Sequence, residues 1–232
     1  MKPKLNLRHP LYMKHLLIAT LTISSAISQT PHEKRLDDAA SVLQEVMATP
    51  DRAIPQQLLN KAECIVVVPA LKKGAFIIGG KFGRGYFSCR KPGKIGWSAP
   101  AGIKVEGGSI GFQIGGSESD VIMIVQNQRG AQRLLESKFT LGGDAQAAAG
   151  PVGRAASADT DVTLRAEILT YSRSRGLFAG ISLQGATLRG DDEANKSIYG
   201  KAITAKEIIG EAVAPPKAEK LLAALNKYSS RK

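Results

Sequence analysis

Residues 64–100 constrain the fold more than any other stretch of this chain. They read CIVVVPALKKGAFIIGGKFGRGYFSCRKPGKIGWSAP. The β-branched run at 65–68 predicts a buried strand that ends at Pro69, and the Lys-Lys-Gly sequence at 72–74 predicts a turn. From Ala75 onward the apolar positions recur with a period of two, and glycines fall between them. The stretch therefore predicts twisted strands with close backbone approaches rather than helices.

The strand pattern continues toward the C-terminus with one change of phase. Ile103 and Val105 share one parity, whereas Ile110 shares the other with the apolar residues that follow it. The change falls at Gly107-Gly108, where a β-bulge would keep the apolar residues on one face. Further strands are predicted at 121–125, 164–171 and 177–188, and a basic turn at 172–176 joins the last two.

Helices are predicted at both ends of the chain after residue 28. Thr30 and Glu33 form a capping-box pattern at the start of the first helix, and Pro50 ends it. We expect its apolar stripe to pack on the core, because its polar face is mixed and net acidic, unlike that of a membrane-surface helix. A second capping box at 204–207 and a helix after Pro215-Pro216 follow near the C-terminus. Shorter helices are predicted at 54–62 and 127–139, and the Gly/Ala-rich residues 141–156 predict a tight loop or a closely packed helix and turn.

These elements predict an α+β fold. It consists of a glycine-rich, largely antiparallel β-sheet, open or barrel-like, with N-terminal and C-terminal helices. A chain of 232 residues is long enough to bury a substantial core. We expect residues 29–232 to form a single domain.

Residues 1–28 resemble a secretory signal peptide. Four cations and no acidic residue precede or flank a mildly apolar segment, and Ala26 and Ser28 suit cleavage after Ser28. The apolar run is short for a membrane anchor, which is the alternative and which needs about 20 residues. We therefore expect an exported protein, periplasmic or secreted, whose net charge falls from +12 to +8 on cleavage. In an oxidising compartment Cys64 and Cys89 could pair, or each could be a small buried thiol.

The ionisable residues argue against an enzyme, a metal site and a cofactor. His32 is the only histidine after residue 28, and it lies on the polar side of the first helix. One histidine and two cysteines make a catalytic triad or a zinc site a poor prediction. The glycines do not form a phosphate-binding loop, because Lys81 is followed by Phe82 and no helix follows. The acidic residues 191–193 could hold a hard cation, but such a run is more often a solvated loop.

A basic segment is the remaining functional signal. Glu63 and Glu106 enclose 42 residues without Asp or Glu but with eight cations, from Lys72 to Lys104. Cations on strand ends and loops bind phosphates and raise the local concentration of anions. A solvated basic face is the alternative. Nucleic acid is not predicted as a partner, because the chain carries an export signal and no stripe of aromatic residues for base stacking.

Ordered blocks across the chain resemble the SYLF domain family. The blocks are IPQQLLNKAECIVVVP, GGKFGRG followed by WSAP, GSIGFQIGG, LGGDAQAAAGPVGR and YSRSRGLFAGISLQG. The resemblance covers about residues 33–226. The resemblance implies phospholipid binding, with phosphoinositides as the ligands of eukaryotic relatives. In the family, an amphipathic first helix and basic residues are implicated in lipid binding. Some eukaryotic relatives also bind actin filaments. This sequence departs from that pattern in its export signal and in a first helix that is not strongly basic. The family has no established catalytic residues to carry over.

We therefore expect non-enzymatic binding of anionic phospholipid by a peripherally membrane-associated protein. The residues predicted to contact head groups are Lys72, Lys73, Lys81, Arg84, Arg90, Lys91 and Lys94, with Arg173 and Arg175 as second-rank candidates. The first helix would add apolar contacts only if it detached from the core. The alternative is an exported structural or interaction protein whose basic face binds an acidic polymer or a partner protein.

Overall fold

A computed structural model describes residues 29–49, 53–76, 78–91, 95–110, 115–153, 165–174 and 176–229. The predicted signal peptide, residues 1–28, lies outside this part of the chain, as do Lys94 and Arg175.

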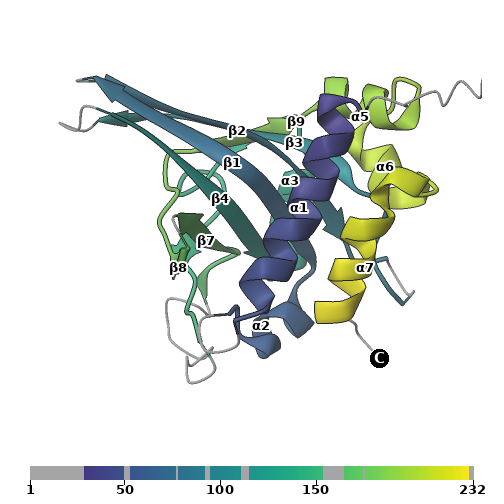
Figure 1. The fold of residues 1–232 in the computed structure, drawn as a ribbon, viewed down its shortest axis with the longest axis horizontal. Helices are drawn as coiled ribbons and strands as arrows, with labels where there is room; N and C mark the ends of the chain where they lie inside the picture. Colours follow the sequence, from purple (N-terminus) through teal and green to yellow (C-terminus); the bar gives the residue numbers. More distant parts are fainter. Residues whose placement is uncertain are drawn as a thin grey trace, which may run out of the picture.

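The described residues form a nine-stranded β-sheet that curls into a half-barrel (Figure 1). The strand order is β5-β9-β3-β2-β1-β4-β7-β6, with β8 paired to β7. Among the described strands only β6 and β7 pair in parallel. The strands are β1 (Cys64–Phe76), β2 (Ile78–Cys89), β3 (Ala101–Ile110), β4 (Gly115–Val125), β5 (Lys138–Thr140), β6 (Ala147–Ala149), β7 (Ile168–Ser174), β8 (Leu177–Gly180) and β9 (Thr187–Gly190).

Helices from both ends of the described chain cover one face of this sheet, so the α+β prediction is confirmed. Helix α1 lies across β1 and β2, and α7 lies beside α1 (Figure 1). The capping box predicted at Thr30 and Glu33 is present at the start of α1. The helical segments are α1 (Pro31–Met47), α2 (Gln56–Lys61), α3 (Gln128–Leu134), α5 (Asp192–Tyr199), α6 (Ala205–Glu211), the short 3₁₀ helix η2 (Pro216–Ala218) and α7 (Glu219–Tyr228).

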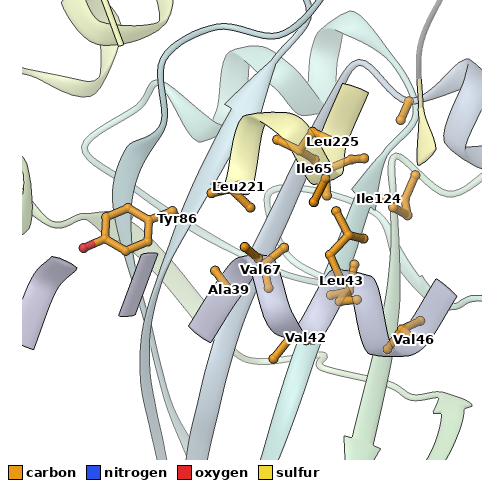
Figure 2. Packing of buried hydrophobic residues seen from close by; sticks show 14 of the residues in the cluster. Ala39, Val42, Leu43, Val46, Ile65, Val67, Tyr86, Ile124, Leu221 and Leu225 are labelled. Carbon is orange, nitrogen blue, oxygen red and sulfur yellow. The ribbon is translucent and has the colours of Figure 1, made fainter. Parts of the chain in front are cut away.

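Side chains of β1 are buried on both faces of the sheet. Ile65 and Val67 pack against Leu43 of α1 and Leu225 of α7 (Figure 2). Val66 and its alternate neighbours pack on the other face, in a cluster with residues of α3, α6 and the β5–β9 region. Burial on both faces explains why the run at 65–68 is continuously β-branched rather than alternating.

Pro69 does not end the first strand, and residues 72–74 do not form a turn. β1 continues to Phe76, with a shift of register between Val68 and Leu71 against β4. Ala70 has a φ of 53° at this bulge. A bulge accommodates a proline within a sheet because the residue there need not donate to the ladder. Lys72 and Lys73 are therefore strand residues.

Three further sequence predictions need correction. Gly107-Gly108 is not a bulge, because β2 and β3 pair without interruption from Ile78↔Ile110 to Phe87↔Ala101. The strand predicted at 177–188 is two short strands, β8 and β9, separated by residues 181–186. The residues described between 141 and 153 form a turn and the short strand β6, and Phe139 belongs to β5 rather than to a helix.

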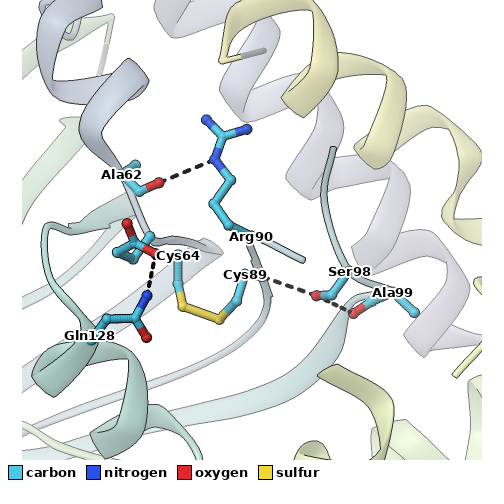
Figure 3. The surroundings of a disulfide bond; sticks show 8 residues. Ala62, Cys64, Cys89, Arg90, Ser98, Ala99 and Gln128 are labelled. Carbon is cyan, nitrogen blue, oxygen red and sulfur yellow. Dashed lines mark hydrogen bonds between the residues drawn. A yellow bond between two sulfur atoms is a disulfide. The ribbon is translucent and has the colours of Figure 1, made fainter. Parts of the chain in front are cut away.

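A disulfide joins the start of β1 to the end of β2. Cys64 and Cys89 are register partners, and their sulfur atoms are 2.01 Å apart (Figure 3). Both cysteines are buried. Of the two alternatives that the sequence left open, the structure has the disulfide.

Candidate functional site

The four central strands extend beyond the helices that cover the sheet. We call this part of the sheet the distal arm: residues 71–76, 78–83, 105–110 and 115–119. In Figure 1 the far ends of β1, β2 and β4 run well past α1, the helix that lies across β1 and β2. The acid-free basic segment of the sequence supplies two of the four strands of this arm.

The candidate lysines lie in adjacent rows across the distal arm. Lys72 pairs with Phe82 on β2 and with Glu118 on β4. In the next row Lys73 pairs with Lys81, and Lys81 also pairs with Gly107 on β3. Successive residues of a strand point to opposite faces, so Lys72 lies on one face and the Lys73–Lys81 pair on the other.

Lys73 and Lys81 place two positive charges directly opposite each other. Neither they nor Lys72 form an ion pair with any residue in the described part of the chain. Partial burial, and then the charge of Lys73, hold the pKa of Lys81 below its ordinary value. Like charges in directly opposite cross-strand positions are destabilising. An anion that reached both ammonium groups would relieve this repulsion.

Beyond the lysines, a row of four glycines crosses the arm. Gly74 of β1 pairs with Gly80 of β2, and these two pair in turn with Gly116 and Gly108. A Cβ atom added at Gly74 or Gly108 would meet no heavy atom within 4 Å. Packing within the chain therefore does not require glycine at these positions. The row leaves bare backbone between the lysines and the ends of the strands.

Two of the predicted arginines are neutralised inside the protein. Arg84 lies 2.9 Å from Glu193 and 3.6 Å from the buried carboxylate of Asp191. The hydrogen bond from Arg84 lowers the pKa of Glu193. Arg173 of β7 pairs with Asp120 at 2.7 Å and with Glu45 of α1. These guanidinium groups connect elements of the fold, and less of their charge is available to an external anion.

Arg90 is buried, and it contacts the C-terminal end of α7. Its guanidinium lies 3.9 Å from the centre of the Trp97 ring. Its Nε donates to the carbonyl of Ala62 at 3.2 Å (Figure 3), and its Nη2 donates to Ser229 Oγ at 2.7 Å. The neighbouring Lys91 is exposed. The structure therefore places Arg90 and Lys91 at the opposite end of β2 from Lys81.

Asp191 is an organising residue that sequence reasoning missed. Residues 191–193 were expected to be a solvated loop, but Asp191 is fully buried. Its carboxylate caps α5 by accepting a hydrogen bond from the backbone N–H of Ala194. The same carboxylate forms an ion pair with Lys104 at 3.2 Å. The signal available in the sequence was a carboxylate followed by a short helical pattern, which is typical of an N-cap. Among the described residues no group of His, Cys, Asp and Glu is arranged to hold a metal ion.

The chain matches a family model over its C-terminal half. The model, Ysc84, is described as "Las17-binding protein actin regulator" and matches residues 106–228, which is 123 of 232 residues. The chain belongs to the Ysc84 family. This assignment agrees with the SYLF resemblance, whose range of about residues 33–226 includes nearly all of the matched region.

Curated relatives extend the Ysc84 match toward the N-terminus. The SH3 domain-containing YSC84-like protein 1 of Xenopus laevis is 36% identical over 201 residues, which cover 83% of this chain and 59% of the relative. The human protein of that name is 35% identical over 185 residues, 78% of this chain and 53% of the relative. LAS seventeen-binding protein 3 of Saccharomyces cerevisiae is 36% identical over 172 residues, 72% of this chain and 37% of the relative. The match thus spans between 37% and 59% of the length of these relatives, less than two thirds of each.

A groove of about 1280 Å³ lies at the other end of the sheet from the distal arm of this Ysc84-family protein. Cys89 contributes to its wall, together with apolar residues of α3 and α6 such as Leu135 and Ile209. Its rim carries charges of both signs: Lys91, Lys201, Lys206, Glu63, Glu207 and Glu211.

None of the helices in the described residues is long and apolar enough to cross a membrane.

Proposed function

We propose that this chain binds anionic phospholipid at a membrane surface, without catalysis, through the lysines of its distal arm. The observation that carries the proposal is the Lys73–Lys81 pair, two cations in register with no acidic partner among the described residues. Lys72 adds a third cation in the adjacent row. Near an anionic surface each such cation contributes about 1 kcal/mol. Arg84 and Arg173 are secondary, because acidic side chains already compensate their charge.

The first helix is not part of the proposed membrane contact. Leu36 and Leu43 of α1 are buried in the cluster that α1 forms with the sheet and α7, with 1% and 0% of their surface exposed. Lys220 of α7 donates to Asp37 at 2.9 Å, and Lys217 pairs with Glu33, so polar contacts also hold α1 in place. Detaching α1 would expose the core. The proposal therefore places the membrane contact on the distal arm.

A protein partner is the second candidate function, and the groove beside α6 favours it. Its apolar wall and a rim with both signs of charge suit a polypeptide better than a uniformly anionic surface. The matched family is described as Las17-binding, and one relative is named LAS seventeen-binding protein 3. We propose that any protein partner of this chain docks there rather than on the distal arm. Substitution of Lys201 and Lys206 would then weaken binding of the protein partner and leave lipid binding unchanged.

Liposome co-sedimentation tests the principal proposal. The chain from Gln29 onward is mixed with neutral vesicles and with anionic vesicles, each at low and at high salt. Sedimentation with anionic vesicles only, weakened by salt, is the expected result, because salt screens exposed charges. Failure to sediment with any vesicle would overturn the lipid proposal and leave the protein-partner candidate. Binding that does not respond to salt would contradict the role of the lysines.

A further inference from the structure

Helix α3 and its C-cap residue turn one stripe of side chains into the groove beside α6. The residues of this stripe are spaced i, i+3, i+4 and i+7 along the chain: Gln128, Ala131, Gln132 and Leu135. Residues with this spacing share one face of a helix. The two apolar members are only partly buried, and the two glutamines are exposed. An amide side chain both donates and accepts hydrogen bonds, so this wall offers apolar and polar contacts together, as a protein–protein interface does.

Helix α6 contributes a glycine to the groove wall that the chain itself does not require. Lys206, Ile209 and Gly210 share one face of this helix and line the groove. A Cβ atom added at Gly210 would meet no heavy atom within 4 Å, and the φ of this residue is not positive. Glycine within a helix is destabilising relative to alanine, and one of its uses is to allow close approach of the backbone to a ligand. Gly210 therefore leaves a bare patch of backbone in the wall.

Val213 extends the apolar part of this wall beyond the end of α6. Its side chain is 89% exposed, the highest value among the large apolar side chains of the described residues. It adjoins Ala212 in the chain, and Ala212 and Ile203 are half-buried in the same groove. The groove volume of about 1280 Å³ exceeds the range of about 300–1,000 Å³ that is usual for small-molecule pockets. The groove therefore suits a segment of polypeptide.

The charge that the rim offers to a ligand is mainly positive. Its exposed lysines form no ion pair with any described residue: Lys91, Lys201 and Lys206. Two of the rim acids are engaged within the protein. Glu207 accepts hydrogen bonds from the backbone and the side chain of Thr204, and Glu63 accepts one from Gln128 at 2.7 Å. Glu211 is the remaining rim acid, so an acidic ligand complements this rim better than a basic one.

We propose that the groove lined by α3 and α6 binds an acidic amphipathic helix of a partner protein. Apolar residues of that helix pack on Leu135 and Val213, and its carboxylates reach Lys201 and Lys206. Its backbone passes over Gly210, where the missing side chain allows two helices to approach closely. Recognition of this kind uses apolar anchors at helical spacing on the bound peptide. This inference rests on the second candidate function and names the chemistry of the partner.

Selection of peptides by the full chain tests which chemistry the groove binds. A phage-displayed library of random peptides of about 16 residues, roughly four turns of helix, is the probe. Enriched peptides are expected to be net acidic, with apolar residues at a spacing of i, i+3, i+4 and i+7. Synthetic versions of them are then titrated with the full chain by fluorescence anisotropy. Circular dichroism of the peptide, with and without the protein, reports whether it becomes helical on binding.

Two variants locate the binding, and a third controls for charge. Gly210→Leu places a side chain in the groove where no neighbour is met, and it should weaken peptide binding at least ten-fold without loss of stability in urea unfolding. Lys201→Gln/Lys206→Gln should weaken binding roughly ten-fold. Lys72→Gln/Lys73→Gln removes two cations from the distal arm and should leave peptide binding unchanged.

The outcomes separate this inference from the lipid proposal. Selection that enriches no peptide, or that enriches basic peptides, would overturn the inference and leave vesicle binding untouched. Acidic peptides that bind Gly210→Leu as tightly as wild type would also overturn it, because they would bind elsewhere. Gly210→Leu should bind anionic vesicles as wild type does. Loss of vesicle binding in this variant would mean that the groove holds lipid and not a helix, which also overturns the inference.

Discussion

Lys73 of β1 and Lys81 of β2 lie directly opposite each other, and no acidic side chain in the described part of the chain neutralises either. Two of the arginines, by contrast, form ion pairs: Arg84 with Glu193 and Arg173 with Asp120. The Lys73–Lys81 pair therefore has an electrostatic cost that these two arginines do not have. Such a cost is expected where an anion is bound.

Removal of one of these charges should stabilise the free protein. Lys81→Gln is expected to raise the free energy of unfolding by about 0.2–1 kcal/mol, the range of a cross-strand pair interaction. Lys201→Gln, in an exposed loop, is the control and should change it little. Urea unfolding at neutral pH measures both. A loss of stability in Lys81→Gln would show that its ammonium group has a favourable partner.

The same pair predicts a dependence of stability on pH. The pKa of Lys81 is lower in the folded protein than its ordinary value, so the unfolded chain holds its proton to higher pH. The contribution of Lys81 to stability therefore rises as the pH increases through its folded pKa. This rise should be absent in Lys81→Gln when unfolding is followed from neutral to alkaline pH. An identical pH profile in the two proteins would contradict the shift.

Arg90 should be required for folding stability and not for membrane binding. Arg90→Gln loses the contact with Trp97 and charge-assisted hydrogen bonds to Ala62 and Ser229, which is expected to cost about 2–4 kcal/mol. Urea unfolding measures the loss, and co-sedimentation is then done at a temperature where the variant is folded. Normal stability with weakened vesicle binding would return Arg90 to the head-group site that the sequence suggested.

Two glycines of β2 should respond oppositely to alanine. A Cβ at Gly85 would lie 2.1 Å from the backbone carbonyl oxygen of Val67, so Gly85→Ala is expected to destabilise by about 3 kcal/mol or more. At Gly80 the nearest atom would be 4.0 Å away, so Gly80→Ala is expected to be neutral or to stabilise by up to about 1 kcal/mol. Thermal unfolding of the two variants compares them. Equal losses would show that the glycine row packs against something in the folded chain.

The disulfide should account for a substantial part of the stability. Cys64 and Cys89 are 25 residues apart, and closing a loop of this size stabilises by about 3 kcal/mol in the chain-entropy model. The Cys64→Ala/Cys89→Ala variant should lose this amount in urea unfolding. Wild-type protein unfolded under reducing conditions provides the comparison. Two reactive thiols in the unreduced native protein would contradict the bond.

Much of the fold could be predicted from residue patterns that act locally. The capping boxes at Thr30 and Thr204 mark real helix starts, and the β-branched run at 65–68 is a buried strand. Pro69 misled the prediction because the bulge at Ala70, which depends on pairing with β4, cannot be seen in local sequence. The phase change at Gly107-Gly108 led to a wrong prediction of a bulge, because local sequence does not show where the strand leaves the core. A bulge is needed only if one face must stay buried, and the distal arm extends beyond the core.

The candidate site could be predicted only as a set of cations, without knowledge of which were already paired. Arg173 and Glu45 are 128 residues apart, and Arg84 and Glu193 are 109 apart, so their ion pairs depend on tertiary structure. Arg90 looked like its neighbour Lys91, but the chain turns Arg90 onto Trp97 and leaves Lys91 in solvent. The three lysines were distinguished from the arginines by strand register and by ion-pair partners, which a single sequence does not display.

Vesicle binding by two matched charge variants tests the central claim most directly. Lys72→Gln/Lys73→Gln/Lys81→Gln removes three cations from the distal arm, and Lys196→Gln/Lys201→Gln/Lys206→Gln removes three exposed cations from the helical side. At about 1 kcal/mol per cation, the first should bind anionic vesicles roughly a hundred-fold more weakly than wild type, and the second should bind nearly as well as wild type. Equal losses in the two variants would mean that net charge, and not the arm, governs binding. Full binding by the first variant would contradict the account.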